Sequence, residues 1–238
     1  MPEFNMQKTF NRLSQRATEL VNKGDKTSYP PRTEELITYV DQMKPCINRI
    51  IAAIEEFIEI NIASKVSDTF QKNREKVNTS DKLAEAFNHV AIESERSAPN
   101  LSRTLKDAAD VHLKMATARK SFNDNVNKTF IEDLKSFLSG SLADALKAKT
   151  ELQESRLDMD STKSKVKNAK DNETRAKFEA ELRQDEVEFD KIHRESVAAF
   201  EKAAKDYDDL RFKLFDLMDA QKTFYENLAK ECSAMLRE

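Results

Sequence analysis

The fold is decided by residues 101–170, which read LSRTLKDAADVHLKMATARKSFNDNVNKTFIEDLKSFLSGSLADALKAKTELQESRLDMDSTKSKVKNAK. Gly140 is the only glycine in this stretch, and proline is absent from it. Apolar side chains recur at helical spacing, as at Phe130, Leu134 and Leu138. At about 1.5 Å per residue, one helix over this stretch would be on the order of 100 Å long. No globular domain of this mass has an interior of that length, so we expect an elongated helical bundle.

The rest of the chain shares this shortage of turn-forming residues. The whole chain of 238 residues includes only 2 Gly, 5 Pro and no Trp, and all the prolines precede residue 100. A sheet protein of this size needs many turns, and turns draw on Gly and Pro for their dihedral angles. The composition therefore excludes most sheet architectures. It predicts an all-α fold of three long, kinked helices in an antiparallel coiled-coil bundle.

Apolar seams mark the other helices. Between residues 36 and 57 the apolar positions alternate at intervals of four and three, which is typical of a coiled coil, and Thr33 is the expected N-cap. A shorter helix is expected at residues 81–97, with a boundary at Pro99. A turn is expected at Asp171-Asn172, and the last long helix is expected to begin at Thr174 and to end at about residue 236.

Bends and dimerisation are expected from the same helices. Pro45, Gly140 and a change of apolar spacing at residues 199–207 should each bend a helix. Ile51 and Ile58 widen the apolar stripe beyond one seam, and a slender bundle has too much surface for its volume to bury it alone. We therefore predict a homodimer, in which the bends produce a crescent shape.

Charge and cysteine content exclude several classes of protein. The 40 Lys+Arg and 43 Asp+Glu residues give a net charge of -3, so no general basic field for nucleic acid exists. The most apolar stretch, residues 50–62, contains three glutamates and is too short to span a bilayer. Cys46 and Cys232 lack metal-ligand spacing and are expected to be reduced thiols of a cytoplasmic protein.

Patterns typical of catalysis are missing. The three histidines are His89, His112 and His193, and none follows a glutamate by three residues, as ligands of a di-iron bundle would. Asp190 precedes His193 at that spacing, but a lone pair is more often a surface contact. No Gly-rich phosphate loop or nucleophile elbow occurs. We expect no enzymatic activity, catalytic residue, metal or cofactor; a four-helix metalloenzyme is the weakest alternative.

A basic cluster lies where the last two long helices meet. Residues 163–177 carry six basic and two acidic residues, a net charge of +4. Near an anionic leaflet each basic residue contributes about 1 kcal/mol, so two such tips on a rigid dimer could hold a membrane. The alternative is a solvated hairpin end. The predicted lipid-binding residues are Lys163, Lys165, Lys167, Lys170, Arg175 and Lys177.

An amphipathic helix is predicted at residues 6–23, ahead of a linker that contains Pro30 and Pro31. Its apolar side chains would enter the acyl boundary while its basic side chains meet lipid head groups. The alternative is docking of this helix on the bundle, although the linker favours independence. The predicted membrane-inserting residues are Met6, Phe10, Arg12, Leu13, Arg16, Leu20 and Val21.

Segments along nearly the whole chain resemble BAR domains, in particular those of endophilins. Each motif is loose, but the order and spacing make the combination fairly specific. The matching segments are Phe130-Ile131-Glu132-Asp133-Leu134 and Arg156-Leu157-Asp158-Met159-Asp160 for the second helix and tip, Leu217-Met218-Asp219-Ala220-Gln221 with Phe224-Tyr225 for the third helix, and Phe10 with Glu19-Leu20-Val21 and Lys26-Thr27 for the N-terminal helix.

The resemblance implies a crescent-shaped dimer that senses or generates membrane curvature in vesicle trafficking or endocytosis. It implies a cytoplasmic, peripheral membrane protein whose tip lysines contact anionic phospholipid, with trafficking proteins as further partners. Residues 54–81 lack the proline-containing insertion that acts as a second wedge in endophilins.

The resemblance also suggests a division of the chain. We expect residues 1–5 to be a remnant of cloning, residues 6–29 to form the amphipathic helix and linker, and residues 30–238 to form the BAR domain. The sequence has no SH3 domain of the endophilin kind. It is therefore expected to be either an excised domain or a BAR-only protein. The main alternative is a coiled-coil, protein-binding scaffold without direct lipid binding.

Overall fold

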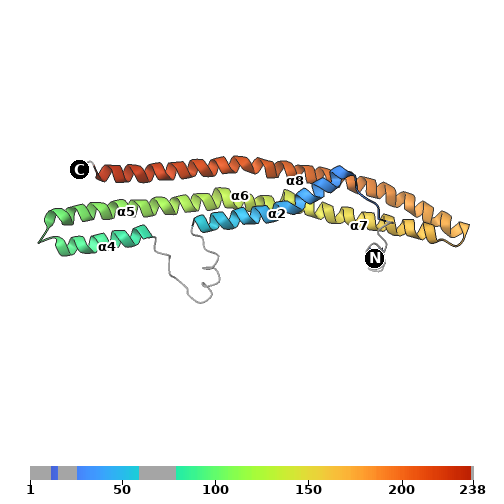
Figure 1. Cartoon of the computed structure of the whole chain (residues 1–238), viewed down its shortest axis with the longest axis horizontal. Helices are drawn as coiled ribbons and strands as arrows, with labels where there is room; N and C mark the ends of the chain where they lie inside the picture. The colour runs from blue at the N-terminus through green and yellow to red at the C-terminus, as the bar shows by residue number, and fades with distance from the viewer. Residues whose placement is uncertain (1–11, 16–25, 59–78, 237–238) are drawn as a thin grey trace. The chain divides into compact units, whose positions relative to one another are not determined.

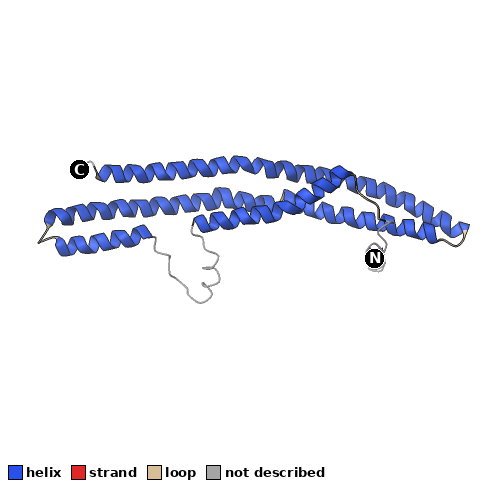
Figure 2. Ribbon diagram, viewed as in Figure 1, coloured by secondary structure: helices blue, strands red, loops and turns tan. Residues whose placement is uncertain are grey.

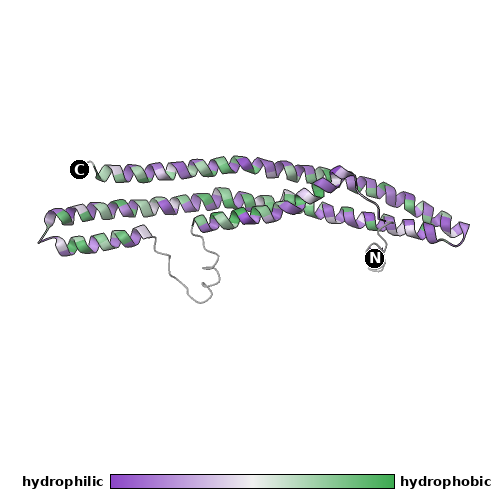
Figure 3. Ribbon diagram, viewed as in Figure 1, coloured by the Kyte–Doolittle hydropathy of each residue, from purple (hydrophilic) through white to green (hydrophobic). Residues whose placement is uncertain are grey.

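The computed structural model describes residues 12–15, 26–58 and 79–236, and within them every regular element is helical (Figure 1; Figure 2). This confirms the predicted all-α fold. In Figure 3 hydrophobic and hydrophilic positions alternate along the helices, as expected of amphipathic elements. The elements are α2 (Pro31–Phe57), α4 (Thr79–Ser94), α5 (Pro99–Val126), the π-helix η1 (Asn127–Ile131), α6 (Glu132–Ser139), α7 (Ser141–Asn168) and α8 (Asn172–Met235).

The chain divides into two compact units. The first unit comprises residues 1–47 and 136–208, and the second unit comprises residues 48–135 and 209–238. Helix α7 lies in the first unit, and α4 and α5 lie in the second. Helices α2, α6 and α8 each contribute residues to both units.

The chain passes between the units beside the irregularities that the sequence marks. Pro45 lies inside α2 close to the end of the first unit, and its nitrogen has no hydrogen to donate to the carbonyl of Asp41. The passage through α6 is flanked by η1 and Gly140. In α8 the boundary between the units lies after Asp208, directly beyond the change of apolar spacing at residues 199–207.

The long helix predicted over residues 101–170 consists of four helical elements in direct succession, α5, η1, α6 and α7. The break between α6 and α7 lies at Gly140, where the sequence predicts a bend. In η1 the N–H of Glu132 donates to the carbonyl of Asn127, five residues back, which is the π-helical pattern. At Gly140 a Cβ atom would lie 2.9 Å from the carbonyl oxygen of Ser136, so the close backbone approach there suits glycine.

The helix starts follow local chemistry, with one correction. Helix α2 begins at Pro31, where the missing N–H of proline costs nothing. Thr33 is therefore not the N-cap: it is buried in the first turn, and its Oγ1 lies 2.8 Å from Nε2 of His193 in α8. Helix α5 begins at Pro99, which confirms the predicted boundary.

The core of the first unit joins α2, α7 and α8. Its buried side chains include Met43 and Ile47 of α2, Leu152 of α7 and Phe200 of α8. A polar contact also joins two of these helices: the hydroxyl of Ser196 in α8 donates a hydrogen bond to the carbonyl of Ala148 in α7 at 3.1 Å. The described core of the first unit is therefore formed by packing of α2, α7 and α8.

In the second unit, α4 and α5 form a helical hairpin. Ser102 of α5 donates to the carbonyl of Ala91 in α4 at 2.7 Å, and both residues are buried. Phe122 of α5 stacks on Phe224 of α8, with ring centroids 4.9 Å apart. Arg119 lies over the Phe224 ring, at 5.5 Å from its centroid. These contacts place α5 against α8.

Candidate membrane-binding surfaces

The hairpin tip between α7 and α8 is closed by a capping carboxylate. Asp171 accepts hydrogen bonds from the backbone N–H of Thr174 at 2.8 Å and from its hydroxyl at 2.9 Å. The backbone bond from Thr174, followed by the hydroxyl bond, lowers the pKa of Asp171 below its ordinary value. Asp171 is thus the N-cap of α8 and fixes the turn that carries the basic cluster.

Four residues of the predicted lipid-binding cluster form ion pairs within the first unit. Lys165 lies 3.3 Å from Glu181, and its ammonium lies 5.7 Å from the centroid of Phe178. Arg175 and Lys177 pair with acids one turn away on α8, and Lys163 lies near Asp160. Ion pairs of partly or fully exposed side chains are weak, so these four cations remain reachable by a competing anion.

The other two predicted residues of the cluster are Lys167 and Lys170. Both are exposed. Lys170 makes no ion pair or hydrogen bond within the described part of the chain, and Lys167 does have a polar contact. The tip therefore presents exposed positive charge at its end, while its flanks are neutralised by neighbouring acids that lie mostly outside residues 163–177.

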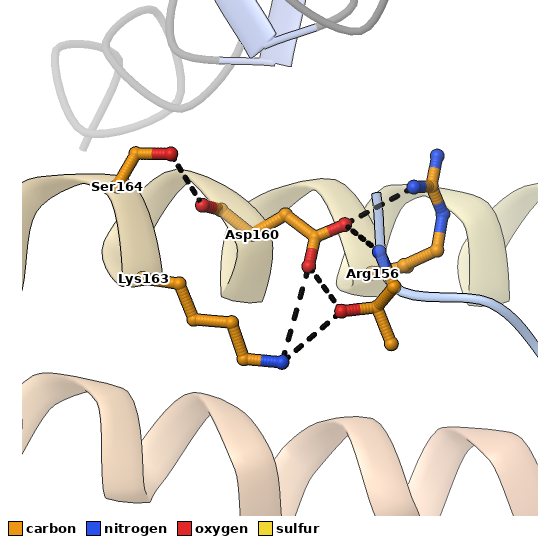
Figure 4. A network of polar contacts seen from close by, with 5 residues as sticks. Arg156, Asp160, Lys163 and Ser164 are labelled. Carbon is orange, nitrogen blue, oxygen red and sulfur yellow. Dashed lines mark hydrogen bonds and ion pairs between the residues drawn. The ribbon is translucent and has the colours of Figure 1, made fainter. Parts of the chain in front are cut away.

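A buried polar network lies on α7 just before the tip (Figure 4). Arg156 and Asp160, one turn apart, are both buried, with Nη1 and Oδ2 3.1 Å apart. Asp160 also accepts hydrogen bonds from the backbone N–H and the hydroxyl of Thr27, and Lys163 donates to that hydroxyl at 3.1 Å. Ser164 bonds the carbonyl of Asp160. The linker is thereby fastened to α7.

Aromatic rings extend this attachment. The ring of Tyr29 stacks on Phe189 of α8 with centroids 6.4 Å apart, and Phe189 stacks on His193 at 5.9 Å. Arg156 lies over the Tyr29 ring at 6.0 Å. Residues 27–29 are therefore held between α7 and α8, which differs from the independence that the two prolines suggested.

The predicted inserting helix is described only at residues 12–15, which are helical. Arg12 forms ion pairs with Glu154 and Asp158 of α7, whereas Leu13 is 60% exposed. Met6, Phe10, Arg16, Leu20 and Val21 lie outside the described residues. The structure thus shows a docked Arg12 and an outward apolar side chain at Leu13.

An exposed apolar face runs along the C-terminal part of α8. Leu217 and Phe224 are buried, but their neighbours around the helix are not. Phe215 is 66% exposed, and Met218 and Tyr225 are more than half exposed. Aromatic and methionine side chains on one arc of a helix indicate a surface that another helix can cover.

Two searches of the described residues bear on other classes of site. No group of three His, Cys, Asp or Glu side chains among them could hold a metal ion. None of the described helices combines the length and the low polarity needed to cross a membrane.

A comparison with protein families decides the classification. The family model for the BAR domain matches residues 6–238. The chain belongs to the BAR domain family. Membership supports a role in membrane curvature or trafficking in general, and BAR domains generally dimerise and bind membranes rather than catalyse reactions.

The relatives of this BAR domain include a diagnostic antigen and several endophilins. The hydatid disease diagnostic antigen P-29 of Echinococcus granulosus is 59% identical over 238 residues, the full length of both chains. Endophilin-B2 of Rattus norvegicus is 26% identical over 191 residues, which cover 75% of this chain and 47% of the endophilin. Endophilin-B1 of Gallus gallus is 24% identical over 240 residues, covering 96% and 65% of the two chains. The chain thus spans about half to two thirds of the endophilins.

Sequence reasoning about this BAR domain missed the docking residues on α7. Glu154, Asp158 and Asp160 were not predicted to have a role, yet they hold Arg12 and Thr27. A signal was present, because Glu154 and Asp158 are four residues apart and so lie on one face of a helix. Nothing in the sequence indicated which cation they would meet.

Proposed function

We propose that this BAR domain works as a homodimer that binds anionic membranes and senses or generates their curvature in vesicle trafficking or endocytosis. The observation that carries the proposal is the family match over residues 6–238. We further propose that the protein acts at the cytoplasmic face of membranes as a peripheral protein. Trafficking proteins are the proposed additional partners.

The exposed face of α8 supports the homodimer. Phe215, Met218 and Tyr225 lie beside the buried Leu217 and Phe224 on the same helix, so the apolar stripe continues past the part that α5 covers. Apolar burial is worth about 25 cal/mol per Å², and large exposed apolar side chains on one arc favour association. A second copy of this surface is the proposed cover, because a two-fold axis makes one patch complementary to itself.

The hairpin tip supports lipid binding. Lys167 and Lys170 are exposed at the end of the first unit, where Asp171 fixes the turn. One such cation contributes about 1 kcal/mol near an anionic leaflet, so a single tip binds weakly. Two tips on one dimer act together, and the second binding event becomes intramolecular. The N-terminal helix is proposed to add the apolar insertion that bends the bilayer.

A protein-binding scaffold is the second candidate. It is favoured by the ion pairs of Lys165, Arg175 and Lys177, which satisfy part of the cluster without lipid. A scaffold needs no exposed cations at the tip and gains nothing from anionic lipid. The two candidates therefore differ in their response to membrane charge.

Vesicle sedimentation separates the two candidates. We expect binding to rise with the fraction of anionic lipid and to fall when salt shortens the Debye length from about 10 Å near 0.1 M to about 3 Å near 1 M. Replacing Phe10 with Glu should reduce tubulation more than attachment, because attachment depends on the tips. Binding that is absent at low salt, or that ignores anionic lipid, would favour the scaffold.

A further inference from the structure

An acidic groove runs between α7 and α8 in the first unit. Its volume is about 270 Å³. Among the described residues that line it, Arg12 is the only basic one. The groove is lined by Glu151, Glu154, Ser155 and Asp158 of α7, by Asp185, Glu188 and Ile192 of α8, and by Arg12.

Arg12 is seated in this groove by three charge-assisted hydrogen bonds. Its Nε and Nη2 donate to the two carboxylate oxygens of Asp158 at 2.9 and 2.8 Å, and its Nη1 donates to Glu154 at 2.8 Å. The side chains of Arg12 and Asp158 are only 25% and 19% exposed. The hydrogen bond to Asp158 is the main cause that raises the pKa of Arg12, and it outweighs the partial burial of the guanidinium. Planar bidentate pairs of this kind are the strongest that arginine makes.

The same stretch of α7 holds the chain again after the helix. Thr27 is bonded to Asp160, two positions beyond the Asp158 that holds Arg12. Residues 12 and 27 are thus both fastened to residues 154–160. Two anchors on one stretch keep the local concentration of Arg12 near the groove high even when its own bonds are broken.

Within the described residues 12–15, the contact with α7 is ionic, and the apolar side chain of Leu13 is exposed. Leu13 is 60% exposed, while Gln15 is only 5% exposed and its Nε2 finds no hydrogen-bond partner in the described structure. A buried amide without a partner opposes docking. At residues 12–15 the docked state therefore combines a strong ionic contact at Arg12 with the cost of burying the unpartnered amide of Gln15, and the side chain of Leu13 faces outward.

We propose that the acidic groove is a docking site for Arg12 in the N-terminal segment, and that anionic lipid head groups compete with the groove for Arg12. The competition by lipid head groups rests on the membrane binding proposed above, whereas the docking of Arg12 does not depend on it. Asp158 and Glu154 occupy three of the five N–H donors of Arg12, so a lipid phosphate must displace these carboxylates to bond the guanidinium in the same bidentate way. Full insertion of the segment therefore requires release of Arg12 from the groove. Fifteen residues farther on, Thr27 remains attached and tethers the released segment.

A single tryptophan reports both states, because the natural chain contains none. Leu13→Trp is made alone, together with Glu154→Gln and Asp158→Asn, and together with Asp190→Asn and Glu195→Gln. The last pair removes the same charge from exposed positions of α8 that do not line the groove. All three proteins are compared as full chains, and circular dichroism checks their folding.

The first readout is tryptophan anisotropy decay without vesicles. Removing charge-assisted hydrogen bonds of this type should shift the docking equilibrium about tenfold toward the undocked state. We therefore expect a larger fast-motion amplitude in the groove variant, and an unchanged decay in the matched control. Equal decays in all three proteins would overturn the docking site, whether or not the protein binds membranes.

The second readout is the blue shift of the tryptophan on vesicles with a low anionic fraction. We expect the groove variant to insert at about a tenfold lower lipid concentration than Leu13→Trp alone, with the matched control close to the latter. Equal gains in both neutralised proteins would reduce the effect to net charge and overturn the competition. If no protein sediments with anionic vesicles, membrane binding fails while the anisotropy result still decides the docking site.

Discussion

Lys165 near the end of α7 lies 3.3 Å from Glu181 of α8, measured from Nζ to Oε1. This ion pair joins the two helices of the tip, so Lys165 serves the hairpin as well as any lipid. Lys170 has no such partner among the described residues and is exposed. Reversing residues near the tip end therefore tests lipid binding with less cost to the hairpin than reversing Lys165.

Lys167→Glu with Lys170→Glu should weaken binding to anionic vesicles at least about tenfold, because each cation contributes about 1 kcal/mol near the leaflet and its reversal adds repulsion. Vesicle sedimentation measures the effect. Lys191→Glu with Lys205→Glu is the matched control, since both residues are exposed on α8 away from the tip. Equal losses in the two variants would show that net charge, rather than the tip, governs binding.

Asp171→Ala should lower the melting temperature of the hairpin at neutral pH, because it removes the cap of α8. The pKa of Asp171 is lowered in the folded state, so its contribution is present above its ordinary pKa and is lost as the pH falls through the folded value. The difference between the wild type and Asp171→Ala should therefore shrink below about pH 4. Thermal unfolding across pH measures this.

Asp171→Asn provides the control for the pH dependence. Asparagine is also a good N-cap but does not titrate, so its advantage over alanine should persist in acid. A wild-type advantage that stays constant or grows on acidification would contradict the assigned role of the carboxylate.

Asp160→Asn should destabilise the protein by about 3–5 kcal/mol, because it removes the charge of a fully buried carboxylate that pairs with the buried Arg156. Urea unfolding measures the change. Arg156→Met with Asp160→Leu removes both charges together and should recover part of the loss. A single-variant cost below about 1 kcal/mol, the range of exposed pairs, would mean that this pair does not behave as a buried one.

Phe215→Glu with Met218→Glu should convert the protein from a dimer to a folded monomer, because both side chains are exposed in the single chain. Small-angle scattering should give twice 27.3 kDa for the wild type and 27.3 kDa for the variant. Lys191→Gln with Lys205→Gln changes the net charge equally and should remain dimeric. A wild-type mass of one chain would contradict the homodimer.

Much of the fold was predictable because helices need few signals. The lack of Gly and Pro after Gly140 predicted the last helix at about residues 174–236, and α8 spans Asn172–Met235. Pro45 and Gly140 were visible as breaks in the pattern. The π-helix η1 was not, because its altered hydrogen-bond ladder leaves no mark on apolar spacing.

Long-range polar contacts were the part that sequence reasoning could not reach. Threonine is a residue type that often caps a helix, but the hydroxyl of Thr33 forms a hydrogen bond with His193 instead. The basic cluster was counted over residues 163–177, and the count missed Glu181, which pairs with Lys165. Each of these contacts joins residues from different helices, so local patterns cannot reveal them.

The most direct test of a curvature-binding BAR dimer is the amount bound per unit of membrane area on vesicles of graded diameter and constant anionic content. We predict that the bound density rises as vesicle diameter falls and that the slope disappears in Phe215→Glu with Met218→Glu. Equal density on small and large vesicles, or no binding to either at low salt, would contradict the account.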